Sequence, residues 1–233
     1  MNLRFLLGFP LVVAWMVGVG IPGLFVGAFD RKGGILLAIT RGWARLILLC
    51  AGVRVEVEGR EHVPAGPAVY AANHVSALDI PLLFAHLPVR FRIIHKRSLY
   101  WTPVVGQYLY YGGHIDVDRK NAFSAKRSLK RAAERIRGGV SVAVFPEGSR
   151  SPDGRLQSFK RGTFVLAQDA GVPVVPVSLL GVKSVVPAGL VSVQPGRLVL
   201  RLHPAVSTEG RDAEAVADEV RAVIERDLRE SAA

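Results

Sequence analysis

The chain has 233 residues, of which 50% are hydrophobic and 21% charged, and its formal net charge is +11. This length suits one compact domain of about 180 residues with an appendage. Because Cys50 is the single cysteine, a disulfide framework and a thiolate zinc cluster are excluded, and neither metal nor redox chemistry is expected.

The first 50 residues are expected to anchor the chain to a membrane. Residues 5–29 contain no charged side chain, and as a helix they would be about 37 Å long, enough to cross the ~30 Å hydrocarbon layer. Pro10, Pro22 and several glycines permit a kinked or shallow helix as readily as a straight span. A cleaved signal peptide is the competing interpretation, but the apolar stretch is longer than a signal core and no clear cleavage site follows it.

A second helix is predicted for residues 35–51, after a turn at residues 30–34. Arg41 and Arg45 would lie on one polar side of it, as expected for a helix at a membrane interface.

Beyond residue 52, strand-like runs alternate with helical patterns, which predicts an α/β layered domain with its site at the ends of strands. The expected strands are residues 53–57, 68–72, 91–95, 139–145, 172–180 and 197–203. The expected helices are residues 122–137, with Asn121 as N-cap and Gly138 as the end, and residues 213–228.

Positive charge is concentrated between Pro88 and Gly162. This stretch has 16 lysines and arginines against five acidic residues, which equals the +11 excess of the whole chain. Anionic headgroups, a phosphorylated substrate or an acidic carrier protein would be attracted to such a surface. Nucleic acid is the alternative partner, but no zinc finger, helix-turn-helix or basic-aromatic motif supports it, so none is expected.

His74 and Asp79 lie five positions apart directly after an apolar strand-like run. An imidazole can take a proton from an alcohol near neutral pH, and a carboxylate on its other nitrogen would fix the tautomer. The alternative is a turn histidine beside a helix-capping aspartate. Ser76 lacks the Gly-x-Ser-x-Gly setting of a nucleophile and is expected to cap a helix that begins near Ala77, so no covalent intermediate on this serine is expected.

A second polar cluster follows another apolar run, in residues 142–151. It contains Glu147 and Arg150 in a loop broken by Pro146 and Gly148, which is where an α/β sheet presents its functional side chains.

Together, His74-x-x-x-x-Asp79 and Phe145-Pro146-Glu147-Gly148-Ser149-Arg150 resemble the motifs of glycerolipid acyltransferases, most closely the 1-acyl-sn-glycerol-3-phosphate acyltransferases. Residues 113–119 and 172–177 resemble two further blocks in the expected order. The resemblance extends from about residue 53 to 203. Ser149 stands where threonine is more usual, and Asp116, where an apolar residue or proline is usual, would put an acid near the expected phosphate pocket.

This resemblance implies a mixed sheet flanked by helices in residues 51–233, preceded by an N-terminal apolar helical pair in residues 1–50. It implies transfer of a fatty acyl group from acyl-ACP or acyl-CoA to the sn-2 hydroxyl of 1-acyl-sn-glycerol 3-phosphate (lysophosphatidic acid), which gives phosphatidic acid. His74 would be the general base and Asp79 its orienting partner. No metal or cofactor beyond the thioester co-substrate is expected.

Arginine and lysine side chains suit the phosphate of the acceptor, whereas Glu147 would either bind a glycerol hydroxyl or pair with an arginine. The expected substrate-binding residues are Lys96, Arg119, Glu147, Gly148, Ser149, Arg150 and Lys160. The enzyme would work on the cytoplasmic face of the inner membrane. The alternatives are an acyltransferase for another lysolipid, such as lyso-ornithine lipid, and a basic membrane-surface scaffold without chemistry.

Overall fold

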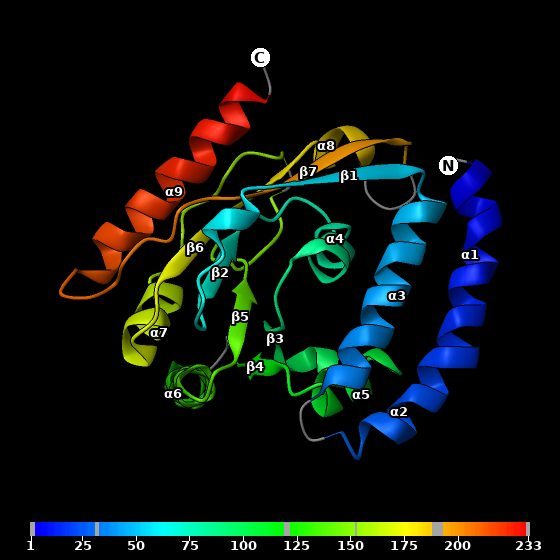
Figure 1. The fold of residues 1–233 in the computed structure, drawn as a ribbon, viewed down its shortest axis with the longest axis horizontal. Coiled ribbons are helices and arrows are strands. Elements are labelled where there is room, and N and C mark those ends of the chain that lie inside the picture. Colours follow the sequence, from blue (N-terminus) through cyan, green and yellow to red (C-terminus); the bar gives the residue numbers. More distant parts are fainter. Residues whose placement is uncertain (1–2, 31–32, 119–121, 152, 188–192, 232–233) are drawn as a thin grey trace.

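The structure, a computed structural model, describes residues 3–30, 33–118, 122–151, 153–187 and 193–231. A twisted sheet lies between two layers of helices, and the N-terminal helices stand at one side (Figure 1). Within the described residues the sheet has seven strands in the order β1-β7-β6-β2-β5-β3-β4. The strands are β1 (Val53–Glu58), β2 (Val69–Ala72), β3 (Phe91–Lys96), β4 (Ile115–Val117), β5 (Ser141–Val144), β6 (Val174–Leu180) and β7 (Gly196–Leu202).

The sheet is mixed, as predicted. Strands β2 to β6 run parallel to one another, whereas β7 pairs antiparallel with β6 and parallel with β1. All six predicted strands are present. The sequence missed only β4, whose three residues are too few to show a period of two. Because β2, β3, β5 and β6 are parallel, their carboxyl ends lie at one edge of the sheet.

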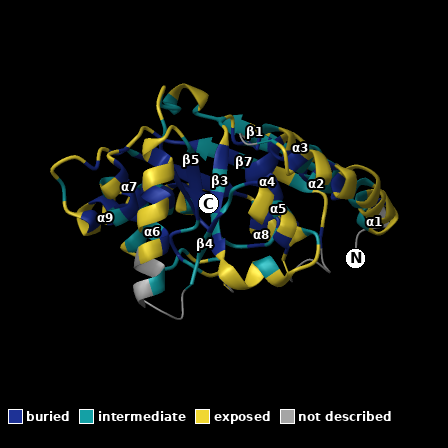
Figure 2. Cartoon of the chain, turned by 90° about the horizontal axis from the view of Figure 1, so that it is seen from below, coloured by how far each residue is buried: buried dark blue, intermediate teal, exposed yellow. Residues whose placement is uncertain are grey.

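Each face of the sheet has its own hydrophobic core, because alternate side chains of a strand point to opposite faces. Along β2, Val69 and Ala71 belong to one core and Tyr70 and Ala72 to the other. The first core is covered by α6 (Ala122–Arg137), α7 (Gly162–Ala170) and α9 (Ala213–Glu230). The second is covered by α3 (Gly34–Cys50), α4 (Asp79–His86) and α5 (Val105–Tyr111), with α8 (Val182–Val185) at its edge. Figure 2 shows this arrangement from below, with buried strands between helices whose outer sides are exposed.

The predicted helical boundaries at α6 and α9 agree closely with the structure. Helix α6 ends at Arg137, directly before Gly138, while its expected cap, Asn121, lies outside the described residues. At α9 the Asp212 side chain accepts the backbone N–H of Glu214 at 2.8 Å, which caps the helix start. Two short 3-10 helices, η2 (Arg60–His62) and η3 (Arg97–Trp101), complete the fold.

The N-terminal apolar segment is a helix interrupted in the middle. It consists of α1 (Leu3–Trp15), a π-helical turn η1 (Met16–Gly20) and α2 (Ile21–Gly27), so the expected irregularity occurs among its glycines. Residues 5–27 form a helix long and apolar enough to cross a membrane by length and composition. Most of its large apolar side chains are exposed, which is unlike the core helix of a soluble domain.

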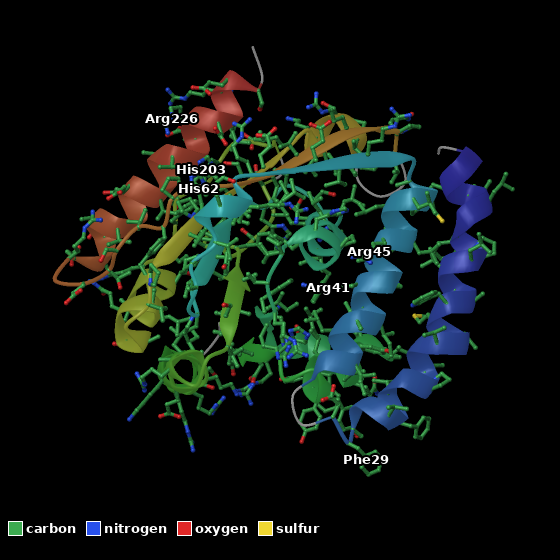
Figure 3. All side chains as sticks on the ribbon, viewed as in Figure 1. Phe29, Arg41, Arg45, His62, His203 and Arg226 are labelled. Carbon is green, nitrogen blue, oxygen red and sulfur yellow. The ribbon has the colours of Figure 1, made fainter. Side chains whose placement is uncertain are left out.

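Helix α3 is part of the core of the domain, and the interfacial position expected for it stays a prediction. It packs between α1 and α4, and its side chains Leu37, Ala44 and Leu48 belong to the core of the domain. Arg41 lies on the α4 side (Figure 3) and donates hydrogen bonds to the carbonyls of Leu87 and Val89 at 3.1 and 2.7 Å. A domain boundary at residue 50 stays a prediction, since α3 shares this core.

Candidate active site

His74 lies in the loop that follows β2, at the carboxyl edge of the sheet. Its Nδ1 is 2.8 Å from Oδ2 of Asp79, which leaves Nε2 as the nitrogen available to a substrate. The ring is 15% exposed and lines a cavity of about 750 Å³. The structure therefore brings the two motif residues together, with the imidazole at the surface of a cavity.

Asp79, the first residue of α4, is completely buried. The same Oδ2 that faces His74 also accepts the backbone N–H groups of Val75 and Ser76, at 2.7 and 2.8 Å. These bonds close the loop into a tight turn and compensate the burial of a carboxylate. The Ser76 hydroxyl accepts the N–H of Leu78 at 3.2 Å, so it is engaged in the turn before α4. It does not cap the helix as predicted, because α4 begins at Asp79 and Leu78 occupies the N-cap position.

The loop after β5 forms the wall behind His74. The Phe145 ring stacks on the imidazole, with centroids 3.9 Å apart and planes 15° from parallel. Ser151 donates its N–H to the His74 carbonyl at 2.8 Å. The position of the imidazole is therefore restrained by contacts from the neighbouring strand as well as by Asp79.

Glu147 contacts the backbone of the His74 loop. Its Oε1 accepts the N–H of His74 at 2.6 Å, and its Oε2 accepts the N–H of Gln157 at 3.0 Å. The residue is only 3% exposed, and burial raises the pKa of its carboxyl. Both oxygens already have backbone partners, and Glu147 is not among the residues that line the large cavity. This geometry favours a positioning role over the direct substrate contact that the sequence suggested.

The residues after Glu147 turn toward the cavity. Gly148 has a φ of +77°, and a Cβ there would lie 2.7 Å from Cε of Lys160, so both conformation and space favour glycine. Gly148, Ser149 and Arg150 all line the cavity.

Cations surround the cavity, although not all those predicted. Lys96 at the end of β3 and Arg150 line it. Lys160 packs over Gly148 but is not a lining residue. Arg119 lies outside the described residues.

Sequence reasoning missed two polar lining residues, Lys183 and His95. Lys183 lies in α8, directly after β6, and contacts the carbonyl of Asp153. His95 is buried in β3, where desolvation lowers its pKa, and its Nε2 has no hydrogen-bond partner among the described residues. Both sit at or near the carboxyl end of a strand that borders the site, and this position is the signal that could have identified them.

Asp116 does not line the cavity of His74, although the sequence placed it near the expected phosphate pocket. Its carboxylate accepts a hydrogen bond from Nε of Arg97 at 2.8 Å. It lines a separate cavity of about 480 Å³ near the end of α2. The register of β4 against β3 places it there, because Asp116 pairs with His95.

Comparison with known proteins agrees with this geometry. The family model described as Acyltransferase matches residues 54–180, a range that contains the His74 loop, the Glu147 loop and β6. The chain belongs to the acyltransferase family.

This acyltransferase is similar over most of its length to several characterised proteins. It is 34% identical over 231 residues to a 1-acyl-sn-glycerol-3-phosphate acyltransferase of Chlamydomonas reinhardtii, covering 96% of this chain and 67% of the relative. It is 38% identical over 187 residues to 1-acyl-sn-glycerol-3-phosphate acyltransferase alpha of Mus musculus, covering 76% of this chain and 66% of the relative. The chain thus spans about two thirds of these two relatives, and 52% of a chloroplastic relative from Arabidopsis thaliana.

A solved structure shares the fold. The 1-acyl-sn-glycerophosphate acyltransferase PlsC of Thermotoga maritima superposes with a TM-score of 0.83 at 30% identity, covering 98% of this chain and 94% of that one. Because the match covers 98% of this chain, it includes the N-terminal helices as well as the layered domain.

Proposed function

We propose that this acyltransferase transfers a fatty acyl group from an acyl thioester to the sn-2 hydroxyl of 1-acyl-sn-glycerol 3-phosphate, forming phosphatidic acid. The observation that carries the proposal is the His74 ring, bound through Nδ1 to a buried carboxylate and facing a cavity with basic side chains at its edge. The names of the relatives support the choice of acceptor.

In the proposed mechanism His74 acts as general base. As the acceptor hydroxyl oxygen attacks the thioester carbonyl carbon, Nε2 takes the hydroxyl proton, and Asp79 stabilises the imidazolium that forms. Collapse of the tetrahedral intermediate breaks the carbon–sulfur bond, and the departing thiolate takes the proton from Nε2. The ester and the free thiol are the products, and the histidine returns to its starting state.

The acceptor phosphate would bind to the cations of the cavity. Arg150 offers a planar fork and Lys96 a point charge, and Lys183 adds a third cation. Arg119 and Lys160 are retained as further candidates from the sequence motifs. The remaining lining includes apolar side chains such as Val75, Ile80 and Ile93, which suit acyl chains.

The donor would be acyl-ACP or acyl-CoA, because both present a thioester and both are acidic. With such a donor, the proposed site of reaction is the cytoplasmic face of the inner membrane, where a thioester from inside the cell would meet a lysolipid of the bilayer.

The decisive experiment uses the purified full-length protein with radiolabelled 1-acyl-sn-glycerol 3-phosphate and either acyl-ACP or acyl-CoA. We expect labelled phosphatidic acid with at least one donor and none from the His74→Ala variant. Lyso-ornithine lipid, supplied in a parallel reaction, tests the other acceptor. Turnover of that lipid alone would replace the proposed substrate, and turnover of neither would favour a non-catalytic scaffold.

A further inference from the structure

Exposed apolar side chains are not scattered over this protein. Within the described residues, every large exposed hydrophobic side chain beyond residue 50 lies between residues 99 and 111, in η3 and α5. The exposed fraction is 87% for Trp101 and 68% for Tyr110. The members of this group, which we call the aromatic ridge, are Leu99, Trp101, Val105, Tyr110 and Tyr111. An exposed apolar group concentrated in one short segment indicates an interaction surface.

The aromatic ridge is joined to the N-terminal helices. The Tyr108 hydroxyl in α5 donates to the carbonyl of Gly20 at 2.7 Å, and Figure 1 shows α5 beside α2. Leu99, Val105 and Tyr108 share an apolar cavity of about 280 Å³ with Trp15 and other residues of the N-terminal helices. The ridge therefore continues the apolar surface of those helices.

The backbone holds the ridge in a defined conformation. Between η3 and α5, Val104 has a φ of +63°, which a β-branched residue rarely adopts and which the surrounding structure must impose.

The neighbouring end of α2 is exposed and apolar as well. Phe25 is 73% and Phe29 88% exposed, and Phe29 projects away from the protein (Figure 3). Tryptophan and tyrosine favour the boundary between water and hydrocarbon, because an apolar ring carries a polar N–H or O–H group. Lys96, exposed just before η3, adds attraction to anionic headgroups.

We propose that the aromatic ridge is a second membrane-binding element, which inserts into the lipid interface beside the N-terminal helices. Leu99 lines both the apolar cavity and the cavity of His74, so the ridge reaches the candidate active site at this residue. A lipid acceptor would enter there from the bilayer without crossing water. This second consequence rests on the proposed function, whereas the insertion itself does not. A bilayer fits this surface better than a second copy of the chain, because the ridge is continuous with a helix apolar enough for membrane insertion.

Trp101 provides a direct probe of insertion. Trp15→Phe with Trp43→Phe leaves it as the only tryptophan of the three in the chain. The protein is reconstituted into vesicles of phosphatidylethanolamine and phosphatidylglycerol whose acyl chains are brominated near the headgroup, and Trp101 fluorescence is compared with that in unbrominated vesicles. The matched control replaces all three tryptophans by phenylalanine and introduces Arg229→Trp on α9, whose native side chain is 77% exposed.

We expect bromine to quench Trp101 strongly and the control tryptophan weakly. Equal quenching of the two would overturn the proposal, and so would loss of a dimer on Trp101→Ala in sedimentation, which would assign the ridge to a second copy. The measurement does not depend on turnover, so it stands even if the proposed reaction fails.

A functional comparison tests the route to the active site. Trp101→Ala combined with Tyr110→Ala should lower turnover of bilayer-embedded acceptor about tenfold, while turnover of detergent-dispersed acceptor changes less than about twofold. Trp101→Phe in place of Trp101→Ala should recover most of the lost turnover. Equal losses with both forms of acceptor, at unchanged thermal stability, would show that the ridge does not serve lipid access.

Discussion

The carboxylate of Glu147 accepts the backbone N–H of His74 at 2.6 Å. A residue of one motif thus fixes the main chain of the other, across the neighbouring parallel strands β5 and β2. We infer that the pairing of these motifs reflects a requirement for positioning the base, and that Glu147 acts through His74 rather than on the substrate.

Glu147→Gln separates these two roles. The glutamine amide can accept only one of the two backbone hydrogen bonds, and its NH₂ group faces the second backbone N–H. The change should cost about 1–3 kcal/mol of stability. If Glu147 positions His74, kcat should fall about 10- to 100-fold with little change in KM for the acceptor. A raised KM at constant kcat would instead indicate contact with the glycerol. Glu56→Gln, at an exposed position on β1, is the control and should behave as wild type.

His74→Ala should remove activity while leaving the fold and membrane binding intact. General base catalysis is typically worth ~10² to 10⁴ in rate, and steady-state assays with matched circular dichroism spectra measure the loss. His62→Ala, at a histidine outside the cavity, should retain turnover. Near-normal activity of His74→Ala would remove the central claim.

Asp79→Asn should be severely impaired as well. The amide cannot stabilise the imidazolium, and it permits the tautomer with the proton on Nε2. The buried Oδ2 also binds the N–H groups of Val75 and Ser76, so we expect reduced thermal stability, measured by a melting curve. Full activity would leave His74 without its orienting partner.

Arg150→Ala should raise the KM for a phosphate-bearing acceptor, because it removes a charge-assisted contact worth about 1.5–3 kcal/mol. Arg119→Ala is expected to act in the same direction, as is Lys183→Ala. Arg155→Ala supplies the matched control, since its side chain is 89% exposed in the same loop and does not line the cavity. Kinetics unchanged at Arg150 and Arg119 would mean that the phosphate binds elsewhere or that the acceptor is a different lysolipid.

The full-length protein should resist extraction from membranes by high salt and yield only to detergent. A basic surface contributes only about 1 kcal/mol per lysine or arginine and is screened by salt, whereas insertion of apolar helix is not. Removing residues 1–30 should leave only the aromatic ridge and the basic surface on the membrane, so that high salt releases much more of the protein. It should also depress activity on bilayer acceptor more than on dispersed acceptor. A deletion to residue 50 is less informative, because it also removes α3 from the core. Complete release of the intact chain by salt would contradict the anchor.

His114 should make stability depend on acid. Burial, with a contribution from the nearby Arg92 cation, lowers the pKa of His114 from 6.5 to about 3, and its Nδ1 accepts the N–H of Ile93 at 2.9 Å. The unfolded chain binds a proton on this histidine near pH 6.5, whereas the folded chain binds it only near pH 3. The free energy of unfolding therefore falls as the pH drops from 6.5 toward 3, by on the order of 4 kcal/mol in total. His114→Asn keeps an acceptor without the titration. Urea unfolding in detergent at pH 7 and pH 4 should therefore differ less in this variant, and an unchanged difference would exclude His114 as the cause.

The sequence was sufficient for the strands and long helices because each carries a local period. It also identified His74 and Asp79, whose contact spans one turn of chain. The sequence could not predict contacts that depend on pairing between distant segments. Glu147 contacts His74 across 73 positions.

The same limitation explains why the predicted positions of Arg41 and Asp116 were wrong. From the sequence, Arg41 is expected at the polar surface of an amphipathic helix, but in the structure it binds carbonyls of the loop that follows α4. From the sequence, Asp116 is expected near the phosphate pocket, but its register against β3 places it beside Arg97 and outside the cavity of His74. In both cases the missing information was the order and register of elements, which composition does not contain.

The strand order has a consequence for how the protein is made. β1 stands at the edge of the sheet with β7 as its partner, and β2, which precedes the His74 loop, lies between β5 and β6. A ribosome must therefore complete some 200 residues before the first strand meets the last, and pairing over such separations is slow. The apolar N-terminal helix emerges long before that point. We expect the nascent chain to reach the lipid surface while still unfolded, so that the His74 site is assembled on a chain already attached to the membrane.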